Sequence, residues 1–274
     1  MYTAEKPFDD MDYIFEPKSN GVRLLLHNKN GVRRLFTRHG TELTGRIPEI
    51  ENIDLPNCYL DGELVCYQNG IEDFEKVMSR INSNKASTIS NGSINYPLTY
   101  IVFDLLHNQN DLRQLELIER KSILENLFDD SDSIKKTFYI DGSGIGLFER
   151  IKDIGAEGIV AKTKASTYQS KRSYDWLKII NWRQHVCHIT GFKKNGTGWL
   201  IALEENERLI TAGLVEFGMN ETHKKAFYGV AQQLITGENN QYVFIEPLLR
   251  CNIKSRGPLS SGMLHTPVFL DFIT

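Results

Sequence analysis

Lys18 stands in a segment whose residue types could support covalent chemistry, Glu16-Pro17-Lys18-Ser19-Asn20-Gly21-Val22-Arg23. A lysine amine is normally protonated at neutral pH, with a pKa of roughly 10.4, and is then a poor nucleophile. Neighbouring cations and a bound metal ion can lower that pKa and free the lone pair for attack. The segment could therefore hold a covalent nucleophile, although a lone lysine in a turn is more often an ordinary surface residue.

Further motifs follow this segment in a fixed order. They are Thr37-Arg38-His39-Gly40, Asp61-Gly62-Glu63, Phe103-Asp104, Glu157-Gly158-Ile159-Val160-Ala161-Lys162 and Trp176-Leu177-Lys178-Ile179. Each motif alone is a weak signal, but the whole series in this order makes chance a poor explanation. The series resembles that of the covalent nucleotidyltransferases, and most closely that of the small ATP-dependent DNA ligases of phages, viruses and bacterial end joining. The resemblance runs from about Tyr13 to Ile179 and continues more loosely to the C-terminus.

The resemblance implies which residues handle the nucleotide. Lys18 would attack the α-phosphate of ATP, form a phosphoramidate with AMP and release pyrophosphate. Glu16 would meet adenine, and Arg23 would contact ribose. Phe103 would stack on the base, although an ordinary core phenylalanine is nearly as good an interpretation because strands favour aromatic residues.

The same resemblance assigns charged groups to the phosphates and to a metal ion. Lys162 and Lys178 would hold the α-phosphate and stabilise its extra charge in the transition state. Glu63 and Glu157 would bind Mg²⁺ (or Mn²⁺), a hard cation that prefers oxygen ligands and keeps most of its waters. Glu63 could equally contact ribose, and Asp61-Gly62-Glu63 taken alone is simply a turn.

Arg38 and His39 are expected at the nucleic acid. The Thr37–Gly40 segment looks like the family element that grips the 5′-phosphate at a nick, and phosphate contacts position a substrate without reading its sequence. His39 is interpreted as structural or as a DNA contact rather than as a general base. The implied enzyme is a monomer that seals nicked duplex DNA at the expense of ATP, in replication, repair or recombination.

The chain departs from the family pattern at two positions inside these motifs. Asn20 stands where the family usually has aspartate, and we expect adenylation to survive with an altered metal or pH dependence. Ile180 stands where a Lys-x-Lys pair usually offers a second lysine. One phosphate contact is therefore missing or is supplied by another residue, such as Lys171 or Arg172.

The elements that must position these motifs are of mixed type. Alternating and apolar runs predict strands at 22–27, 32–37, 59–68, 100–106, 157–162 and 175–180, and helical spacing predicts helices at 71–81, 115–128 and 145–154. Asn30-Gly31 is a good hairpin turn. The last third predicts strands at 185–192, 198–203, 209–217 and 242–253, with a helix at 221–235, a content that suits an OB-fold.

We therefore expect an α+β chain. A nucleotidyltransferase domain of ATP-grasp-like antiparallel sheets and helices would occupy residues 1–182, and a small all-β OB-fold domain residues 183–274. The family commonly continues from its last strands into an Arg-x-Asp-Lys element that orients pyrophosphate, which is not found before residue 274. Either Lys254 or Arg256 substitutes for it, or self-adenylation is slow.

Composition sets the broad class. The 274 residues are 41% hydrophobic and 24% charged, and the net charge of −3 does not by itself indicate a nucleic-acid binder. Basic residues nevertheless gather between 162 and 183 and between 23 and 38, so a focused basic face could follow phosphates. The four cysteines form no C-x-x-C pair, which argues against a zinc site. No apolar run could span a bilayer and no signal peptide is visible, so we expect a cytoplasmic protein.

Other functions also fit parts of this sequence pattern. An RNA ligase or an mRNA-capping guanylyltransferase of the same superfamily would share most of these motifs. A catalytically weak module that binds nicks or DNA ends would explain Asn20 and Ile180. The Thr37–Gly40 and Trp176–Lys178 segments favour the DNA ligase.

Overall fold

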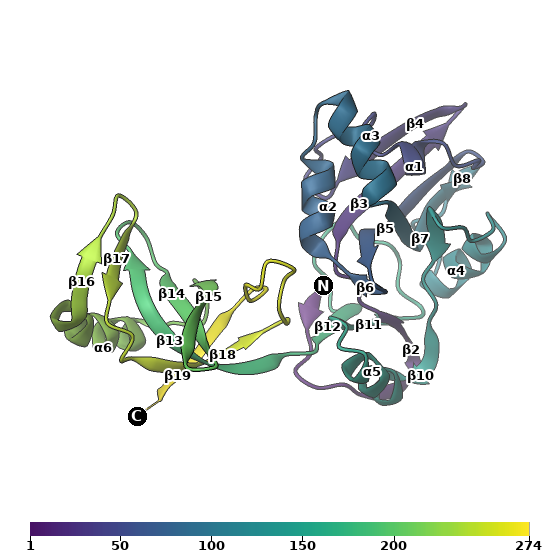
Figure 1. Ribbon diagram of the computed structural model, residues 1–274. Helices are drawn as coiled ribbons and strands as arrows, with labels where there is room; N and C mark the ends of the chain where they lie inside the picture. The colour runs from purple at the N-terminus through teal and green to yellow at the C-terminus, as the bar shows by residue number, and fades with distance from the viewer. Residues whose placement is uncertain (274) are drawn as a thin grey trace. The chain divides into compact units, whose positions relative to one another are not determined.

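The computed structural model describes residues 1–273, which divide into two compact units, Met1–Asn181 and a second unit that begins at Trp182. Each unit has its own buried apolar core. Figure 1 shows that each unit combines strands with helical segments. No helix within residues 1–273 is long and apolar enough to cross a bilayer.

One sheet of the first unit has the strand order β4-β3-β5-β7-β8, with β6 on β5 and β9 on β7. Its strands are β3 (Val22–Lys29), β4 (Val32–Thr37), β5 (Cys58–Gln68), β6 (Ile71–Glu72), β7 (Leu98–Asn108), β8 (Asn110–Asp111) and β9 (Ile134–Lys136). Asn30 and Gly31 both have positive φ, as a tight hairpin turn between β3 and β4 requires. Alternate residues such as Leu24 and Leu26 are buried on one face of β3.

A second sheet of this unit has the order β1-β12-β11-β2-β10. Its strands are β1 (Tyr2–Thr3), β2 (Asp9–Pro17), β10 (Ile140–Ser143), β11 (Gly158–Thr163) and β12 (Trp176–Ile180). The register places Glu16 opposite Val160, and Val160 opposite Lys178. Because β2 ends at Pro17 and β3 begins at Val22, Lys18 lies where the chain passes from one sheet to the other.

Helices cover the outer faces of these sheets. They are α1 (Pro48–Glu51), α2 (Phe74–Ile81), α3 (Ala86–Asn95), α4 (Leu117–Glu125) and α5 (Gly144–Asp153). In Figure 1, α2 and α3 flank the sheet of β3 and β5, whereas α5 lies beside β2 and β10. The N-cap of α2 is Asp73, whose side chain accepts the Lys76 N–H at 3.1 Å and so satisfies a free helical amide.

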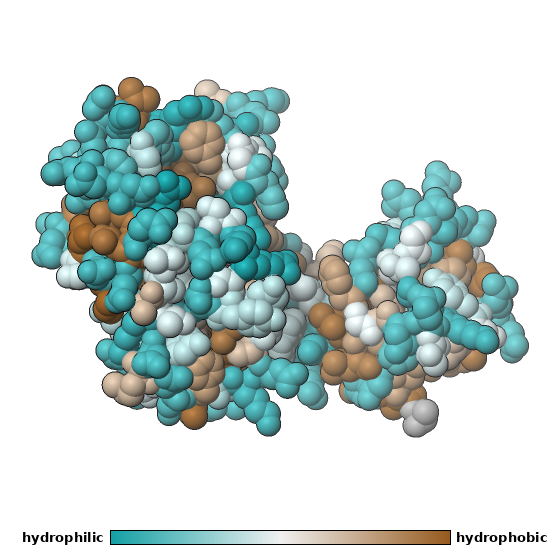
Figure 2. All heavy atoms as spheres, turned by 180° about the vertical axis from the view of Figure 1, so that it is seen from behind, coloured by the Kyte–Doolittle hydropathy of each residue, from teal (hydrophilic) through white to brown (hydrophobic). Residues whose placement is uncertain are grey.

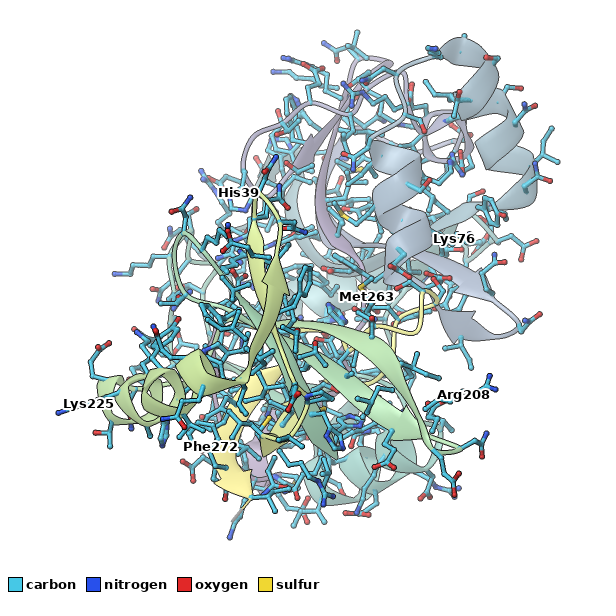
Figure 3. All side chains as sticks on the ribbon, turned by 60° about the vertical axis from the view of Figure 1, so that its left-hand side comes forward. His39, Lys76, Arg208, Lys225, Met263 and Phe272 are labelled. Atoms are coloured by element: carbon cyan, nitrogen blue, oxygen red, sulfur yellow. The ribbon has the colours of Figure 1, made fainter. Side chains whose placement is uncertain are left out.

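The second unit is an antiparallel sheet with one α-helix. Its elements are β13 (Arg183–Lys193), β14 (Trp199–Glu205), β15 (Arg208–Val215), α6 (Glu221–Ala231), the 3-10 turn η1 (Gln232–Leu234), β16 (Ile235–Glu238), β17 (Tyr242–Ile245), β18 (Arg250–Ser255) and β19 (Val268–Ile273). Buried Trp199 packs on Phe227 of α6, with 4.4 Å between ring centroids. Lys225 of α6 and Arg208 at the start of β15 point outward, as Figure 3 shows. The face drawn in Figure 2 is mostly hydrophilic, with separate apolar patches.

The expected mixture of sheets and helices is confirmed, and particular elements differ. The helix predicted at 71–81 begins only at Phe74, because 71–72 form β6 and Asp73 caps the helix. The strand predicted at 242–253 is two strands, interrupted around Pro247, which cannot donate a ladder hydrogen bond. The helix predicted at 221–235 ends at Ala231. Strand β2 and helix α3 were not predicted.

Candidate active site

A cavity in the first unit is lined by residues from both sheets. Strands β2, β3, β5, β7, β11 and β12 contribute, together with the loop at 164–175. The lining comprises Met1, Glu16, Pro17, Lys18, Ser19, Arg23, Arg38, Glu63, Ile101, Phe103, Thr137, Val160, Lys162, Thr167, Tyr168, Gln169, Lys171, Ser173, Asp175 and Trp176. Most of the residues singled out in the sequence therefore face one space.

Lys18 is held by contacts on both its backbone and its side chain. Its N–H donates to the Gly158 carbonyl at 2.9 Å, and its ammonium donates to Glu157 Oε2 at 3.0 Å. Glu157 is buried and Lys18 is largely so. A Cβ on Gly21 would lie 2.1 Å from the Leu64 carbonyl oxygen, so only glycine fits at this point of the loop.

Glu63 brings a second carboxylate to the same end of the cavity. Burial raises the pKa of Glu63 to about 7, while Lys18 lowers it and Glu157 raises it further. A cation bound beside Glu63 and Glu157 would neutralise this concentration of carboxylates. Carboxylate oxygens are ligands that Mg²⁺ accepts while it keeps most of its waters. Within residues 1–273, no group of three or more His, Cys, Asp or Glu side chains is arranged to hold a metal ion.

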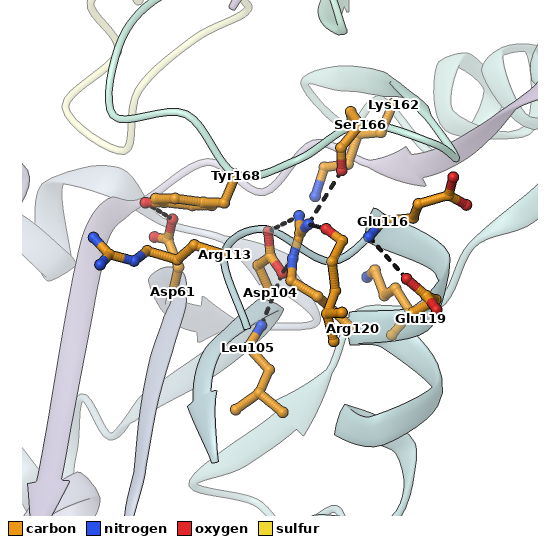
Figure 4. Close-up of polar contacts among 12 residues, drawn as sticks. Asp61, Asp104, Leu105, Arg113, Glu116, Glu119, Arg120, Lys162, Ser166 and Tyr168 are labelled. Carbon is orange, nitrogen blue, oxygen red and sulfur yellow. Dashed lines mark hydrogen bonds and ion pairs between the residues drawn. The ribbon is translucent and has the colours of Figure 1, made fainter. Parts of the chain in front are cut away.

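Arg23 is fixed by a carboxylate and a phenol. Its Nε and Nη2 atoms donate to the two oxygens of buried Asp61, at 2.9 and 2.5 Å. The Tyr168 hydroxyl donates to Asp61 Oδ2 at 2.9 Å and accepts from Arg23 Nη2 at 3.1 Å. The contact between Tyr168 and Asp61, drawn in Figure 4, ties the loop at 164–175 to β5. Two charged or polar partners thus orient the guanidinium at the cavity wall.

A buried cation stands between two aromatic rings at another part of the cavity. Lys162 Nζ lies 4.5 Å from the Phe103 ring centroid and 4.0 Å from that of Trp176. Glu16 Oε2 lies 2.6 Å from Lys162 Nζ, and Lys121 pairs with the other oxygen of Glu16. Burial lowers the pKa of Lys162 to about 8, an effect that Glu16 opposes and Lys121 reinforces.

Asp104, the residue after Phe103, accepts two hydrogen bonds of 2.8 Å from Arg120, and both side chains are fully buried. Arg120 also donates to the Ser166 carbonyl at 3.1 Å, as Figure 4 shows. Burial raises the pKa of Asp104, and the hydrogen bonds from Arg120 oppose that rise. This pair joins β7, α4 and the loop at 164–175, so it holds two walls of the cavity together.

Some predicted residues lie outside the cavity lining. Glu157 is absent from the lining but accepts a hydrogen bond from Lys18, which is part of it. Lys178 shares the sheet face of Glu16 but is absent from the lining. His39 is exposed in the turn that follows β4, next to Arg38, which does line the cavity. Ile180 is buried opposite Gly158, the residue that binds the Lys18 backbone.

Several residues that help to build the site were not predicted from the sequence. Asp61 and Trp176 belong to recognised motifs, yet neither was given a role. Tyr168 lies within the basic stretch at 162–183 and has no motif of its own. Lys121 lies on a helix that was predicted from its apolar residues. The burial of Lys121 on α4 could not be predicted from one sequence, because its partner Glu16 lies far away in the chain, on β2.

The chain is similar to several known proteins. A family model described as ATP dependent DNA ligase domain matches residues 2–179. The chain is 34% identical over 273 residues to the SPbeta prophage-derived DNA ligase-like protein LigB of Bacillus subtilis, covering 98% of this chain and 96% of that protein. It is 31% identical over 231 residues to the multifunctional non-homologous end joining protein LigD of Pseudomonas aeruginosa, covering 78% of this chain but only 26% of that longer protein.

Solved structures show the same fold. The chain resembles mycobacterial DNA ligase D complexed with ATP and MES, with a TM-score of 0.59, 21% identity and coverage of 100% of this chain and 94% of the other. It also resembles a structure from a study of Lig E DNA ligases, with a TM-score of 0.70, 16% identity and coverage of 99% and 98%. At these identities the likeness concerns the fold.

Proposed function

The chain belongs to the ATP-dependent DNA ligase family, and from that premise we propose that this ATP-dependent DNA ligase seals nicks in duplex DNA through a lysyl-AMP intermediate on Lys18. The observation that carries the proposal is the position of Lys18. Its amine stands at a cavity that also holds Phe103, Arg23 and Glu63, in a loop where two sheets meet.

In the first step, the neutral Lys18 amine attacks the α-phosphorus of ATP. A phosphorus–nitrogen bond forms, the bond to the bridging oxygen of the β-phosphate breaks, and pyrophosphate leaves. Glu157 Oε2 already accepts a hydrogen from the Lys18 ammonium and is placed to receive its proton. Glu63, with Glu157, would hold Mg²⁺, which would neutralise charge on the phosphates.

The cavity walls suit the rest of the nucleotide. Phe103 offers a ring face for adenine. Glu16 pairs with Lys162, whose Nζ lies over this ring. Arg23 is held toward the cavity by Asp61, in keeping with a ribose contact. Lys162 would serve the α-phosphate, as would Lys178. The cavity position of Lys171 supports the idea that this residue supplies the contact that Ile180 cannot make.

In the later steps, AMP passes from Lys18 to the 5′-phosphate of a nick, and the adjacent 3′-hydroxyl then attacks that phosphate and expels AMP. Arg38, exposed at the cavity, is the proposed clamp for the 5′-phosphate, with His39 beside it. The antiparallel strands and single α-helix of the second unit suit an OB-fold. We assign DNA contacts and a swinging motion to this domain.

Labelled nucleotides and defined nicks test this proposal. We expect label from ATP, and not from GTP, on the protein, together with sealing of nicked duplex DNA in preference to nicked duplex RNA. GTP labelling would favour the capping-type alternative, and preferential sealing of RNA would favour the RNA ligase. Binding of nicked DNA without any sealing in the presence of ATP and Mg²⁺ would favour a binding module.

A further inference from the structure

We propose that Glu72 is a positioning residue for the nucleophile, because its carboxylate fixes the loop that presents Lys18. The inference rests on adenylation of Lys18 as proposed above. It adds a residue that stands outside the motif series and does not line the cavity. It also gives a physical reason for the neutral side chain at Asn20.

The loop from Lys18 to Gly21 is fixed at both ends and in the middle. At its ends, the Lys18 N–H binds the Gly158 carbonyl, and Gly21 packs closely on the Leu64 carbonyl. In the middle, the Asn20 N–H donates to Glu72 Oε2 at 2.6 Å. A hydrogen bond from an amide to a carboxylate is charge-assisted and roughly twice as strong as one between neutral groups. Glu72 therefore supplies a strong side-chain restraint on this loop.

Glu72 is itself held from both sides. It lies on β6, paired with Tyr67 of β5 beyond the Asn69-Gly70 turn, where both residues have positive φ. The next residue, Asp73, donates its N–H to the Cys66 carbonyl at 2.8 Å and caps α2. The carboxylate that restrains the loop thus stands on backbone fixed by a hairpin and a helix start.

The charges around Glu72 explain why a neutral residue suits position 20. Burial raises the pKa of Glu72, and the hydrogen bond from the Asn20 N–H lowers it. The charge of Glu157 raises this pKa further, whereas that of Lys18 lowers it. Tyr67 lies at the other carboxylate oxygen, with its hydroxyl 3.5 Å from Oε1. An aspartate at position 20 would add a like charge on the residue whose backbone N–H Glu72 already binds, and neighbouring like charges disfavour each other's ionised forms. Asparagine at position 20 donates the same backbone N–H without adding a negative charge.

A graded series at position 72 tests the inference. Two reactions would be timed in single turnovers: formation of lysyl-AMP from ATP, and sealing of a nick that already carries AMP, which does not need the Lys18 amine. Relative to wild type, we expect Glu72→Ala to slow lysyl-AMP formation by roughly tenfold to a hundredfold and Glu72→Gln by less, since glutamine retains an acceptor. Sealing of the pre-adenylated nick should stay within about twofold of wild type for both. Exposed Glu5 provides the matched control, as Glu5→Gln.

A double-mutant cycle adds a test of the charge argument. Asn20→Asp should slow lysyl-AMP formation in the wild-type background and do so much less in Glu72→Gln, where the like charge is absent. The inference is overturned if Glu72→Ala forms lysyl-AMP as fast as wild type, if both reactions fall equally in that variant, or if the two substitutions act additively.

The outcomes also separate this inference from the function on which it rests. Wild-type protein that acquires no AMP on Lys18 would remove both. Wild-type protein that is adenylated normally, with Glu72→Ala unaltered, would remove only the role of Glu72.

Discussion

The ammonium of Lys18 donates a hydrogen bond to Glu157 Oε2 at 3.0 Å, between residues 139 positions apart in the sequence. Glu157 immediately precedes β11, whose first residue, Gly158, accepts the Lys18 backbone N–H. One short stretch of chain thus fixes the nucleophile at its main chain and at its amine. The amine must lose a proton before it can attack phosphorus, so a change at the Glu157 carboxylate should affect this step.

Glu157→Gln should slow lysyl-AMP formation by roughly a hundredfold, because glutamine has no negative charge with which to take up the Lys18 proton. Rapid-quench measurement with labelled ATP reports the rate directly. Glu149→Gln is the control, since Glu149 is exposed and pairs with exposed Lys152, at 3.6 Å. An unchanged rate in Glu157→Gln would exclude this carboxylate from the step.

Nucleotide affinity should depend on pH through Lys162. Burial lowers the pKa of this lysine to about 8, so the folded protein loses the positive charge at position 162 as the pH rises through that value. We expect the affinity for α,β-methylene ATP to fall above about pH 8, by at most roughly tenfold per pH unit. Calorimetry across this range measures it.

Lys162→Arg provides the matched variant for this pH dependence, because arginine stays protonated throughout. Its affinity profile should be flatter above about pH 8, even if the larger guanidinium binds less tightly overall. The assignment fails if the wild type and Lys162→Arg lose affinity in parallel as the pH rises.

Phe103→Leu should weaken ATP binding by removing the ring proposed to stack on adenine. Base stacking on an aromatic side chain is worth about 1–3 kcal/mol, which corresponds to a loss of roughly fivefold to 150-fold in affinity. Phe103→Tyr preserves the ring face and should bind nearly as well as the wild type. Equal affinity of Phe103→Leu and wild type would return Phe103 to a purely packing role.

Arg120→Met should destabilise the first unit, because it leaves the Asp104 carboxylate buried without its ion-pair partner. Breaking such a pair from one side costs about 3–5 kcal/mol of unfolding free energy. Arg113→Met removes one member of an exposed pair with Asp111 and should cost less than about 1 kcal/mol. Urea titration compares the two. Equal losses would contradict the buried character of the Asp104–Arg120 pair.

The sequence predicted the residues that meet at the cavity better than it predicted how they are held. Lys18, Arg23, Glu63, Phe103 and Lys162 all line one space, and each sits in a motif whose spacing is local. Such motifs consist of a few consecutive residues, so they can be recognised in a single sequence.

The supporting contacts are different because they join residues far apart. Tyr168 meets Asp61 across 107 positions, and nothing near Tyr168 in the sequence marks its partner. Strand β2 escaped prediction because its first half, Asp9-Asp10-Met11-Asp12, is exposed and polar, and only the end that leads to Lys18 is buried. The neighbours that complete the site depend on tertiary packing, which overrides local pattern.

Adenylation of Lys18 can be detected by intact-mass analysis of the wild-type protein after incubation with ATP and Mg²⁺, followed by peptide mapping of the modified residue. We expect a gain of one adenylyl group, carried by the peptide that contains Lys18 and absent from Lys18→Ala. A protein that gains no mass, or one that carries the same adduct in Lys18→Ala, would contradict it.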